Sequence, residues 1–172
     1  IVLFVGLFIY GINQGKMTGR EDFAENTIEN QIIKKDSVAD DVSKFRKKLA
    51  QKALSIIDAS IRYTPDYVSI NYPNGDVPAK TGVCTDVVIR SYRKLGIDLQ
   101  KKVHEDMRAN FSIYPKNWGA TKTDTNIDHR RVPNLETFFT KKGKKLKVTQ
   151  NADDYKTGAI VTWMINDKLP HI

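Results

Sequence analysis

The spacing of apolar residues along this chain predicts helices in its first two thirds and strands near its end. From Phe45 to Ile61, apolar side chains recur every three or four positions, which is the pattern of a helix with one buried face. Ser37 can cap the first turn of this helix, which is predicted to run to about Arg62. We expect its apolar face to pack on the core.

Two more helices are predicted after a loop, residues 63–80, that is rich in proline. The first begins at Cys84 and ends at Gly96, since glycine readily takes the left-handed conformation that stops a helix. The second starts at Asp98 and runs to Phe111. The residues expected to face inward from the Cys84 helix are Val83, Val87, Val88, Tyr92 and Leu95.

The last part of the chain changes to strand patterns. Asn134 is expected to cap a short helix that closes at Gly143, and residues 146–148 are a strand candidate. Residues 158–165 are rich in β-branched and aromatic side chains, which favours a stronger strand, and another strand opens at Leu169. Because helices come first and strands last, the predicted fold class is α+β.

The two ends of the chain indicate a fragment of an exported protein. The first twelve residues carry no charge, which is typical of the apolar part of a signal peptide or of a membrane anchor, with a buried core helix as the alternative. We expect residues 1–14 to be this truncated signal peptide or anchor and residues 15–36 to be a linker. Residues 37–172 are then one domain, which is incomplete at its C-terminus.

The net charge of +8 favours anionic partners. Nucleic acid, anionic lipid headgroups and an acidic cell-wall polymer all fit this charge. The chain has no run of interleaved basic and aromatic residues, so no nucleic-acid partner is expected. The chain also lacks a glycine-rich phosphate-binding loop, and no cofactor is expected.

Cys84 is the one cysteine of the chain, so no intramolecular disulfide is possible. Its place in the first turn of a helix predicts a lowered thiol pKa and therefore a nucleophile. A nucleophilic thiol needs a base, and the candidates are His171, His129 and His104. A metal site is disfavoured, because no familiar ligand spacing joins the candidate ligands His104, Glu105, Asp106, Asp128 and His129.

Four segments of the chain resemble a known bacterial family. They are residues 67–107 (YVSINYPNGDVPAKTGVCTDVVIRSYRKLGIDLQKKVHEDM), 111–119 (FSIYPKNWG), 123–139 (TDTNIDHRRVPNLETFF) and 158–172 (GAIVTWMI…LPHI). Together they resemble the family described as domain of unknown function 1287, over roughly residues 50–172. The resemblance implies an exported cell-envelope protein, periplasmic or otherwise extracytoplasmic, with a papain-like, NlpC-type cysteine hydrolase fold.

The wider resemblance to NlpC-type peptidases implies roles for individual residues. Cys84 stands where the nucleophile opens a helix, His171 where the base begins a strand, and Tyr72 near a loop tyrosine that helps to hold the oxyanion. The residue that orients the histidine is expected beyond Ile172. Two departures concern the usual Cys-Ser-Gly, which is Cys84-Thr85-Asp86 here, and the usual Gly-Asp, which is Gly158-Ala159.

The function implied is hydrolysis of an amide bond in cell-wall peptidoglycan peptides. The alternative is a relative that transfers acyl groups or binds envelope ligands without turnover. Substrate contacts are expected from Asp86, Asp128, His129 and Arg130, with Arg130 or Arg131 pairing a substrate carboxylate. Two alternatives stay open: residues 128–130 form a structural cluster of ion pairs and caps, and Asp86 caps its own helix.

Overall fold

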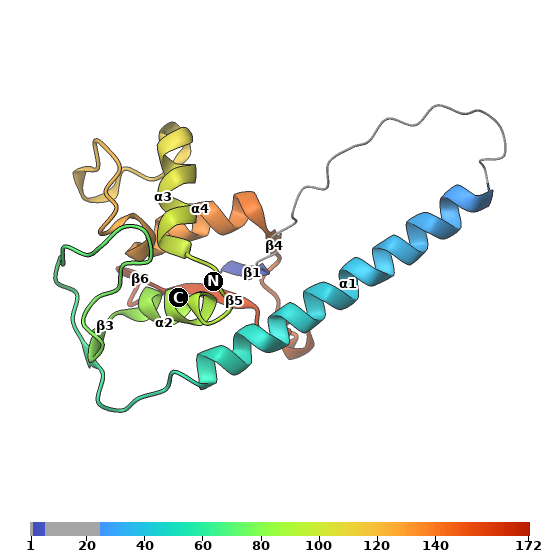
Figure 1. Ribbon diagram of the computed structural model, residues 1–172, viewed down its shortest axis with the longest axis horizontal. Coiled ribbons are helices and arrows are strands. Elements are labelled where there is room, and N and C mark those ends of the chain that lie inside the picture. Colours follow the sequence, from blue (N-terminus) through green and yellow to red (C-terminus); the bar gives the residue numbers. More distant parts are fainter. Residues whose placement is uncertain (1, 6–24) are drawn as a thin grey trace.

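The fold contains a four-stranded antiparallel sheet, on which helix α4 (Val132–Lys142) packs (Figure 1). The computed structural model describes residues 2–5 and 25–172, and the side chains from Val38 onward. The strand order is β4 (Lys144–Leu146), β1 (Val2–Val5), β5 (Ile160–Ile165) and β6 (Leu169–His171). Helices and strands mix in one body, so the class is α+β, as the sequence predicts.

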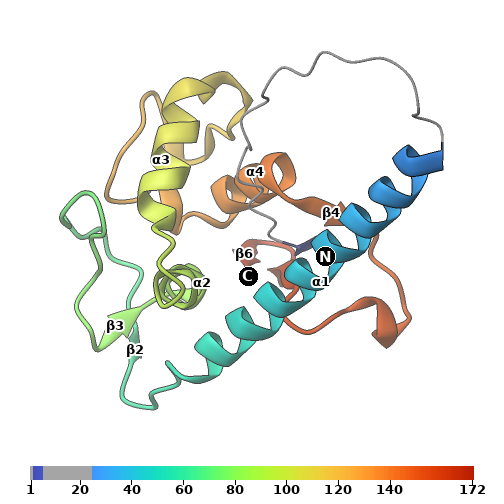
Figure 2. The same ribbon diagram turned by 45° about the vertical axis from the view of Figure 1, so that its right-hand side comes forward.

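The helices and the two remaining strands lie around this sheet (Figure 2). The helices are α1 (Glu25–Leu54), α2 (Cys84–Arg93), α3 (Leu99–Ala109) and α4 (Val132–Lys142), with 3₁₀ turns η1 (Phe111–Ile113), η2 (Asn117–Gly119), η3 (Asp128–Arg130) and η4 (Ala152–Asp154). Two short parallel strands, β2 (Arg62–Tyr63) and β3 (Thr81–Gly82), form a separate ladder just before α2. In both views the C-terminal residue lies beside α2.

The core joins all four helices to the sheet. Its centre is Tyr92 of α2, whose ring packs on Phe45 of α1 and Phe139 of α4. The buried residues of this cluster are Leu49, Ile89, Tyr92, Leu99, Val103, Leu135, Phe138, Phe139 and Ile160. Removal of these side chains from water is the main favourable contribution to folding.

The buried face of α2 differs from the predicted one. Tyr92 is buried as expected, but Val87 is 51% exposed, and Thr85 and Ile89 are buried instead. The sequence pattern identified an amphipathic helix correctly and misjudged its rotation, because Val87 lies on the wall of a cavity rather than in the core.

Helix α1 ends earlier than predicted, at Leu54 instead of about Arg62. The carboxylate of Asp58 accepts hydrogen bonds from the backbone N–H and the hydroxyl of Ser60, and these local bonds compete with a continued helix. Ile56, Ile57 and Ile61 therefore belong to a connecting segment, where they line a cavity.

The N-terminal part of the chain also differs from expectation. Val2–Val5 forms strand β1, which pairs with both β4 and β5, and α1 already begins at Glu25, within the predicted linker. Residue 1 and residues 6–24, which hold the rest of the expected signal or anchor, lie outside the described residues. Among the helices that the structure describes, none is both long and apolar enough to cross a membrane.

Other elements lie close to their predicted places. Helix α3 starts after Asp98, whose carboxylate accepts the N–H of Lys101, and α4 ends at Gly143. Helix α4 begins two residues before the predicted cap, and the side chain of Asn134 instead donates to the carbonyl of Asp128. The first C-terminal strand is Lys144–Leu146, two residues earlier than predicted.

The β5–β6 hairpin is confirmed, and it places His171. Three residues, Asn166–Lys168, connect the strands. Asn166 and Asp167 have left-handed backbone, with φ 50° and 55°, and the N–H of Lys168 donates to the carbonyl of Ile165. The resulting register sets His171 opposite Trp163, and their rings pack with centroids 4.6 Å apart.

Two glycines with left-handed backbone offer a matched test of how α1 docks on the start of β5. At Gly158 (φ 79°) a Cβ would lie 2.1 Å from the carbonyl oxygen of Arg46, whereas at Gly96 (φ 76°) it would meet nothing within 4 Å. We expect Gly158→Ala to lower the free energy of unfolding by about 3 kcal/mol or more. Gly96→Ala should cost about 1 kcal/mol, the backbone strain alone. Urea unfolding measures both, and equal losses would contradict this account.

Candidate active site

Cys84 is the first residue of α2, and a capping interaction holds it there. Val83 precedes it in an extended conformation, with its N–H donating to Oδ2 of Asp86 at 2.7 Å. This capping leaves the N–H groups of Cys84 and Thr85 pointing along the start of the helix, where they can meet a negative charge.

Asp86 is also one half of a buried ion pair. Its two carboxylate oxygens accept from Nε and Nη2 of Arg130, both at 3.0 Å, and each side chain is no more than 3% exposed. This two-point contact fixes the planes of both groups. Asp86 therefore caps its own helix and binds η3. It also lines the cavity that holds Cys84, so its predicted contact with substrate stays a prediction.

Thr85 adds a second link between α2 and η3. Its buried hydroxyl donates to the backbone carbonyl of Arg130 at 3.0 Å. The departure from Cys-Ser-Gly thus has a structural reason, because both Thr85 and Asp86 bind the same residue.

Residues 128–130 are buried, each at 6% exposure or less, and two of their side chains bind other elements. Oδ2 of Asp128 binds Nδ1 of His104 at 3.0 Å and the N–H of Asp124 at 2.8 Å. Burial lowers the pKa of His129 to about 4, so its ring is neutral at pH 7. Asp128 and His129 line neither of the two cavities at Cys84, and their predicted contact with substrate stays a prediction.

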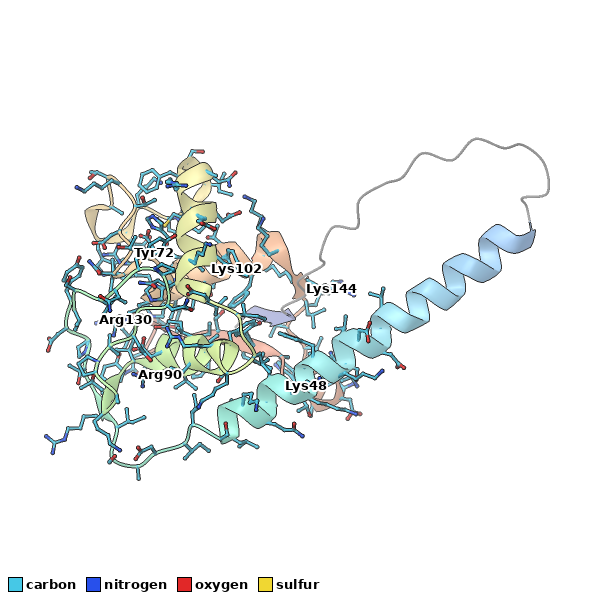
Figure 3. All side chains as sticks on the ribbon, viewed as in Figure 1. Lys48, Tyr72, Arg90, Lys102, Arg130 and Lys144 are labelled. Carbon is cyan, nitrogen blue, oxygen red and sulfur yellow. The ribbon has the colours of Figure 1, made fainter. Side chains whose placement is uncertain are left out.

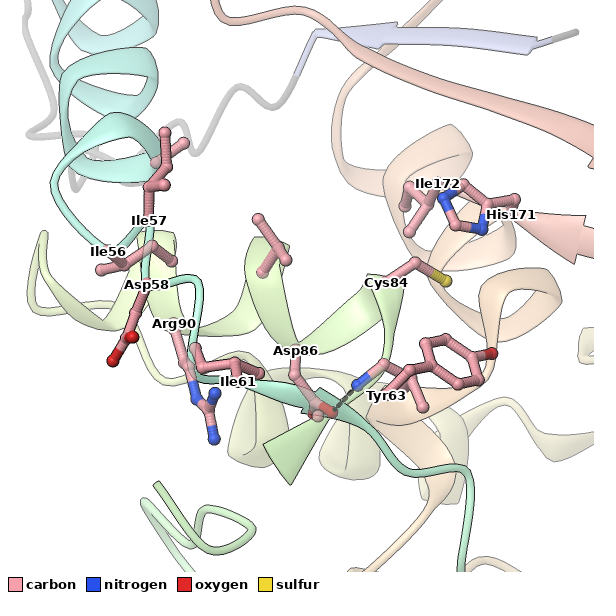
Figure 4. Close-up of a pocket in the computed structure, with 14 residues that line it drawn as sticks. Ile56, Ile57, Asp58, Ile61, Tyr63, Cys84, Asp86, Arg90, His171 and Ile172 are labelled. Carbon is pink, nitrogen blue, oxygen red and sulfur yellow. Dashed lines mark hydrogen bonds between the residues drawn. The ribbon is translucent and has the colours of Figure 1, made fainter. Parts of the chain in front are cut away.

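His171 shares a cavity with Cys84 (Figure 4). This cavity of about 440 Å³, which we name the isoleucine cavity, lies between the end of α1, the start of α2 and the end of β6. Its walls include Ile56, Ile57, Ile61, Val87, His171 and Ile172. Of the three histidines in the chain, all of them described, His171 is the one on this wall.

The predicted tyrosine is not brought to the cysteine. Tyr72 lies beside α3, where its ring packs edge-on against His104 (Figure 3). Tyr63 of β2 takes the place next to Cys84 and lines both cavities there. Sequence reasoning missed Tyr63, because the parallel pairing of β2 with β3 brings it beside α2 and no local pattern marks that pairing.

Burial governs the thiol of Cys84. Loss of contact with water raises its pKa, and the N–H groups of Ile172 and Thr85 lower it to a smaller extent. The charge of Asp86 raises it further. The expectation of a lowered pKa is therefore wrong for this structure, since desolvation outweighs the backbone N–H groups that favour the thiolate. The favourable contact with the Ile172 N–H does place the sulfur at the end of β6, next to His171.

A second cavity opens on the other side of Cys84. This arginine cavity, of about 340 Å³, includes Tyr63, Tyr67, Cys84, Trp118, Arg131 and Leu169 in its walls. The guanidinium of Arg131 lies over the ring of Trp118, 4.9 Å from its centroid. Among the described residues, Arg131 has no acidic partner, whereas its neighbour Arg130 is bound to Asp86.

The candidate metal ligands of the sequence do not converge. Asp128 binds His104, whereas Asp106 binds Lys141, Lys142 and Tyr114. Within the part of the chain that the structure describes, no three His, Cys, Asp or Glu side chains are grouped to hold a metal ion.

Comparisons with known proteins agree with the resemblance to domain of unknown function 1287. A family model described as "Domain of unknown function (DUF1287)" matches residues 50–172. The "Uncharacterized protein YijF" of Escherichia coli (strain K12) is 49% identical over 124 residues. The matched region covers 72% of this chain and 60% of that relative, so the chain spans less than two thirds of the relative's length. No solved structure matches significantly.

We expect the Asp86–Arg130 pair to be essential for stability. Arg130→Met leaves a buried carboxylate without its partner and should lower the free energy of unfolding by about 3–5 kcal/mol. The double variant Asp86→Asn with Arg130→Met should recover part of this loss. Lys80→Ala, which breaks the exposed Lys80–Asp58 pair, is the matched control and should cause no measurable change in urea unfolding. Equal effects of Arg130→Met and Lys80→Ala would contradict the expectation.

The pH dependence of Cys84 alkylation tests the account of its burial. Because burial raises the pKa, the reactive thiolate fraction should grow only above the ordinary inflection near pH ~8.5. The rate of reaction with iodoacetamide, measured across pH, should therefore inflect above that value in the folded protein and near it in urea. An inflection well below it would show a resting thiolate.

Proposed function

We propose that this chain, which belongs to the DUF1287 family, a domain of unknown function, is a cysteine hydrolase. The supporting observation is that Cys84, at the N-terminus of α2, and His171, on β6, line one cavity. A thiol beside an imidazole is the usual basis of nucleophilic catalysis by cysteine.

The raised pKa of Cys84 decides how the first step proceeds. The resting sulfur carries its proton, so His171 acts as a general base and takes that proton as the sulfur attacks the substrate carbonyl. A C–S bond forms, and the carbonyl electrons move to oxygen. The N–H groups of Cys84 and Thr85 at the start of α2 are placed to stabilise this oxyanion, a contribution of roughly 3 kcal/mol per donor.

The second half of the reaction returns the enzyme to its first state. His171 gives its proton to the leaving amine as the C–N bond breaks, which leaves an acyl thioester on Cys84. Water then attacks the thioester, and His171 takes the proton of the water and returns it to the sulfur. The product is a carboxylic acid. The phenol of Tyr63, rather than that of Tyr72, is the tyrosine within the site.

The two cavities that meet at Cys84 indicate what lies on either side of the scissile bond. The isoleucine cavity suits an apolar group, and the arginine cavity suits a carboxylate that Arg131 can bind through two hydrogen bonds. We propose an acidic peptide of the bacterial cell wall as substrate. The net charge of +8 and the resemblance to cell-wall peptidases support this choice and an envelope location.

We also propose a papain-like arrangement for the fold. A helix that opens at the nucleophile and a strand that carries the base support it. The rival function is an envelope-binding or acyl-transferring protein. The observation that favours this rival is the raised pKa of Cys84, because a neutral thiol is a weaker nucleophile.

Hydrolysis can be tested with purified peptidoglycan and chromatography of the released fragments. We expect the full-length protein to release peptides, and Cys84→Ala and His171→Ala to lose at least about 10³-fold in rate. Ile113→Ala, an exposed side chain on η1, is the control and should retain the rate of the unaltered protein. Release by Cys84→Ala at an equal rate, or by none of the proteins, would exclude the proposed hydrolase.

A further inference from the structure

A third cavity continues from the arginine cavity along the surface. It measures about 570 Å³ and shares Trp118 and Pro170 with the arginine cavity. Trp163 of β5 forms another part of its wall, and Trp118 and Trp163 are the two tryptophans of the whole chain. We name this the tryptophan cavity.

Both indole rings are exposed at some cost. Trp118 is 62% exposed and Trp163 is 39% exposed, although large aromatic side chains gain stability from burial. Trp118 also has left-handed backbone angles, φ 57° and ψ 29°, which are strained for a bulky residue. Strained, exposed side chains next to a candidate site are typical of residues that contact a ligand.

The polar side chains of the tryptophan cavity define the kind of ligand. Asn117 offers an amide, Glu136 a carboxylate, and Lys168 an ammonium group, all on the same wall as the two indoles. Apolar rings with a few hydrogen-bonding groups suit a molecule that has flat C–H faces and a rim of hydroxyls. A saccharide ring has this combination. Oε1 of Glu136 already accepts a hydrogen bond from the hydroxyl of Thr162, and a sugar hydroxyl can donate to the same carboxylate.

We propose that the tryptophan cavity binds a saccharide, with the ring stacked on Trp118 and its hydroxyls bonded to Asn117, Glu136 and Lys168. Saccharide binding here needs no turnover and goes beyond the proposed hydrolysis. The further step, that one substrate carries both the saccharide and the amide, rests on the proposed function and on the continuity of the two cavities.

Trp163 connects the saccharide site to the base. The centroid of its ring lies 4.6 Å from the centroid of the His171 ring, and Trp163 also lines the tryptophan cavity. A saccharide in the tryptophan cavity therefore lies close to the ring that packs on His171.

Tryptophan fluorescence is a direct probe, because both tryptophans of the chain line this cavity. The full-length protein is titrated with a β-1,4-linked tetramer of N-acetylglucosamine and, separately, with cellotetraose. We expect at least one of them to change the emission in a saturable way, in the unaltered protein and in Cys84→Ala. Trp118→Ala should weaken binding by roughly tenfold or more, and Trp118→Phe by less.

The controls separate this proposal from hydrolysis and from misfolding. Ile113→Ala, exposed to a similar degree at 56%, should bind as the unaltered protein does, and trialanine should cause no change. Circular dichroism checks that Trp118→Ala is folded, and if it is not, Trp118→Phe carries the test. No response to either sugar at millimolar concentration, equal binding by the folded Trp118 variant, or an equal response to trialanine would overturn the saccharide site. Binding by Cys84→Ala without hydrolysis by the unaltered protein would exclude the hydrolase alone.

Discussion

The buried pair between Asp86 and Arg130 is the interaction on which the candidate site depends. It joins the first turn of α2 to η3, two segments separated by 44 positions in the chain. A charged pair without water is stable only when both partners are present and well oriented, and the two-point contact here meets that condition. Cys84 stands two residues before Asp86, so the same pair holds the sulfur in place.

The position that orients Cys84 also makes its thiol less acidic. The start of a helix favours a thiolate, but burial of the sulfur and the nearby charge of Asp86 favour the neutral thiol, and burial is the largest effect. A site of this kind depends on its base more than one with a resting thiolate does. The proposed mechanism therefore requires His171 to remove the thiol proton, and the ring of His171 packs on Trp163.

Three neighbouring cavities share lining residues, and the cysteine lies where the first two meet. The isoleucine and arginine cavities share Tyr63, Val83 and Cys84, and the arginine and tryptophan cavities share Trp118 and Pro170. The isoleucine cavity thus offers an apolar wall, the arginine cavity a cationic one and the tryptophan cavity an aromatic one. A ligand that combines an apolar group, a carboxylate and a sugar would fit this order of surfaces.

Local patterns determined much of the fold, because helix and turn signals are written in neighbouring residues. The start of α2 at Cys84, the cap at Asp98, the end of α4 at Gly143 and the β5–β6 hairpin all follow from such signals. His171 was the favoured base from the predicted hairpin after residues 158–165 as well as from the family resemblance, and it lines one cavity with Cys84. Asp86 and Arg130 were both noticed as polar residues near the site, but their binding to each other was not.

Tertiary structure decided the features that depend on residues far apart in the chain. Val87 is exposed rather than in the core, and Tyr63 rather than Tyr72 lies beside Cys84. Arg130 is bound to Asp86, whereas Arg131 lines the arginine cavity. Trp118 and Trp163 line one cavity. Tertiary structure also reversed the expected shift of the Cys84 pKa. The sequence by itself determined where a helix begins and which residue opens it. How deeply that residue is buried depends on α1, β2 and β6, and burial sets the energy of a charge on sulfur.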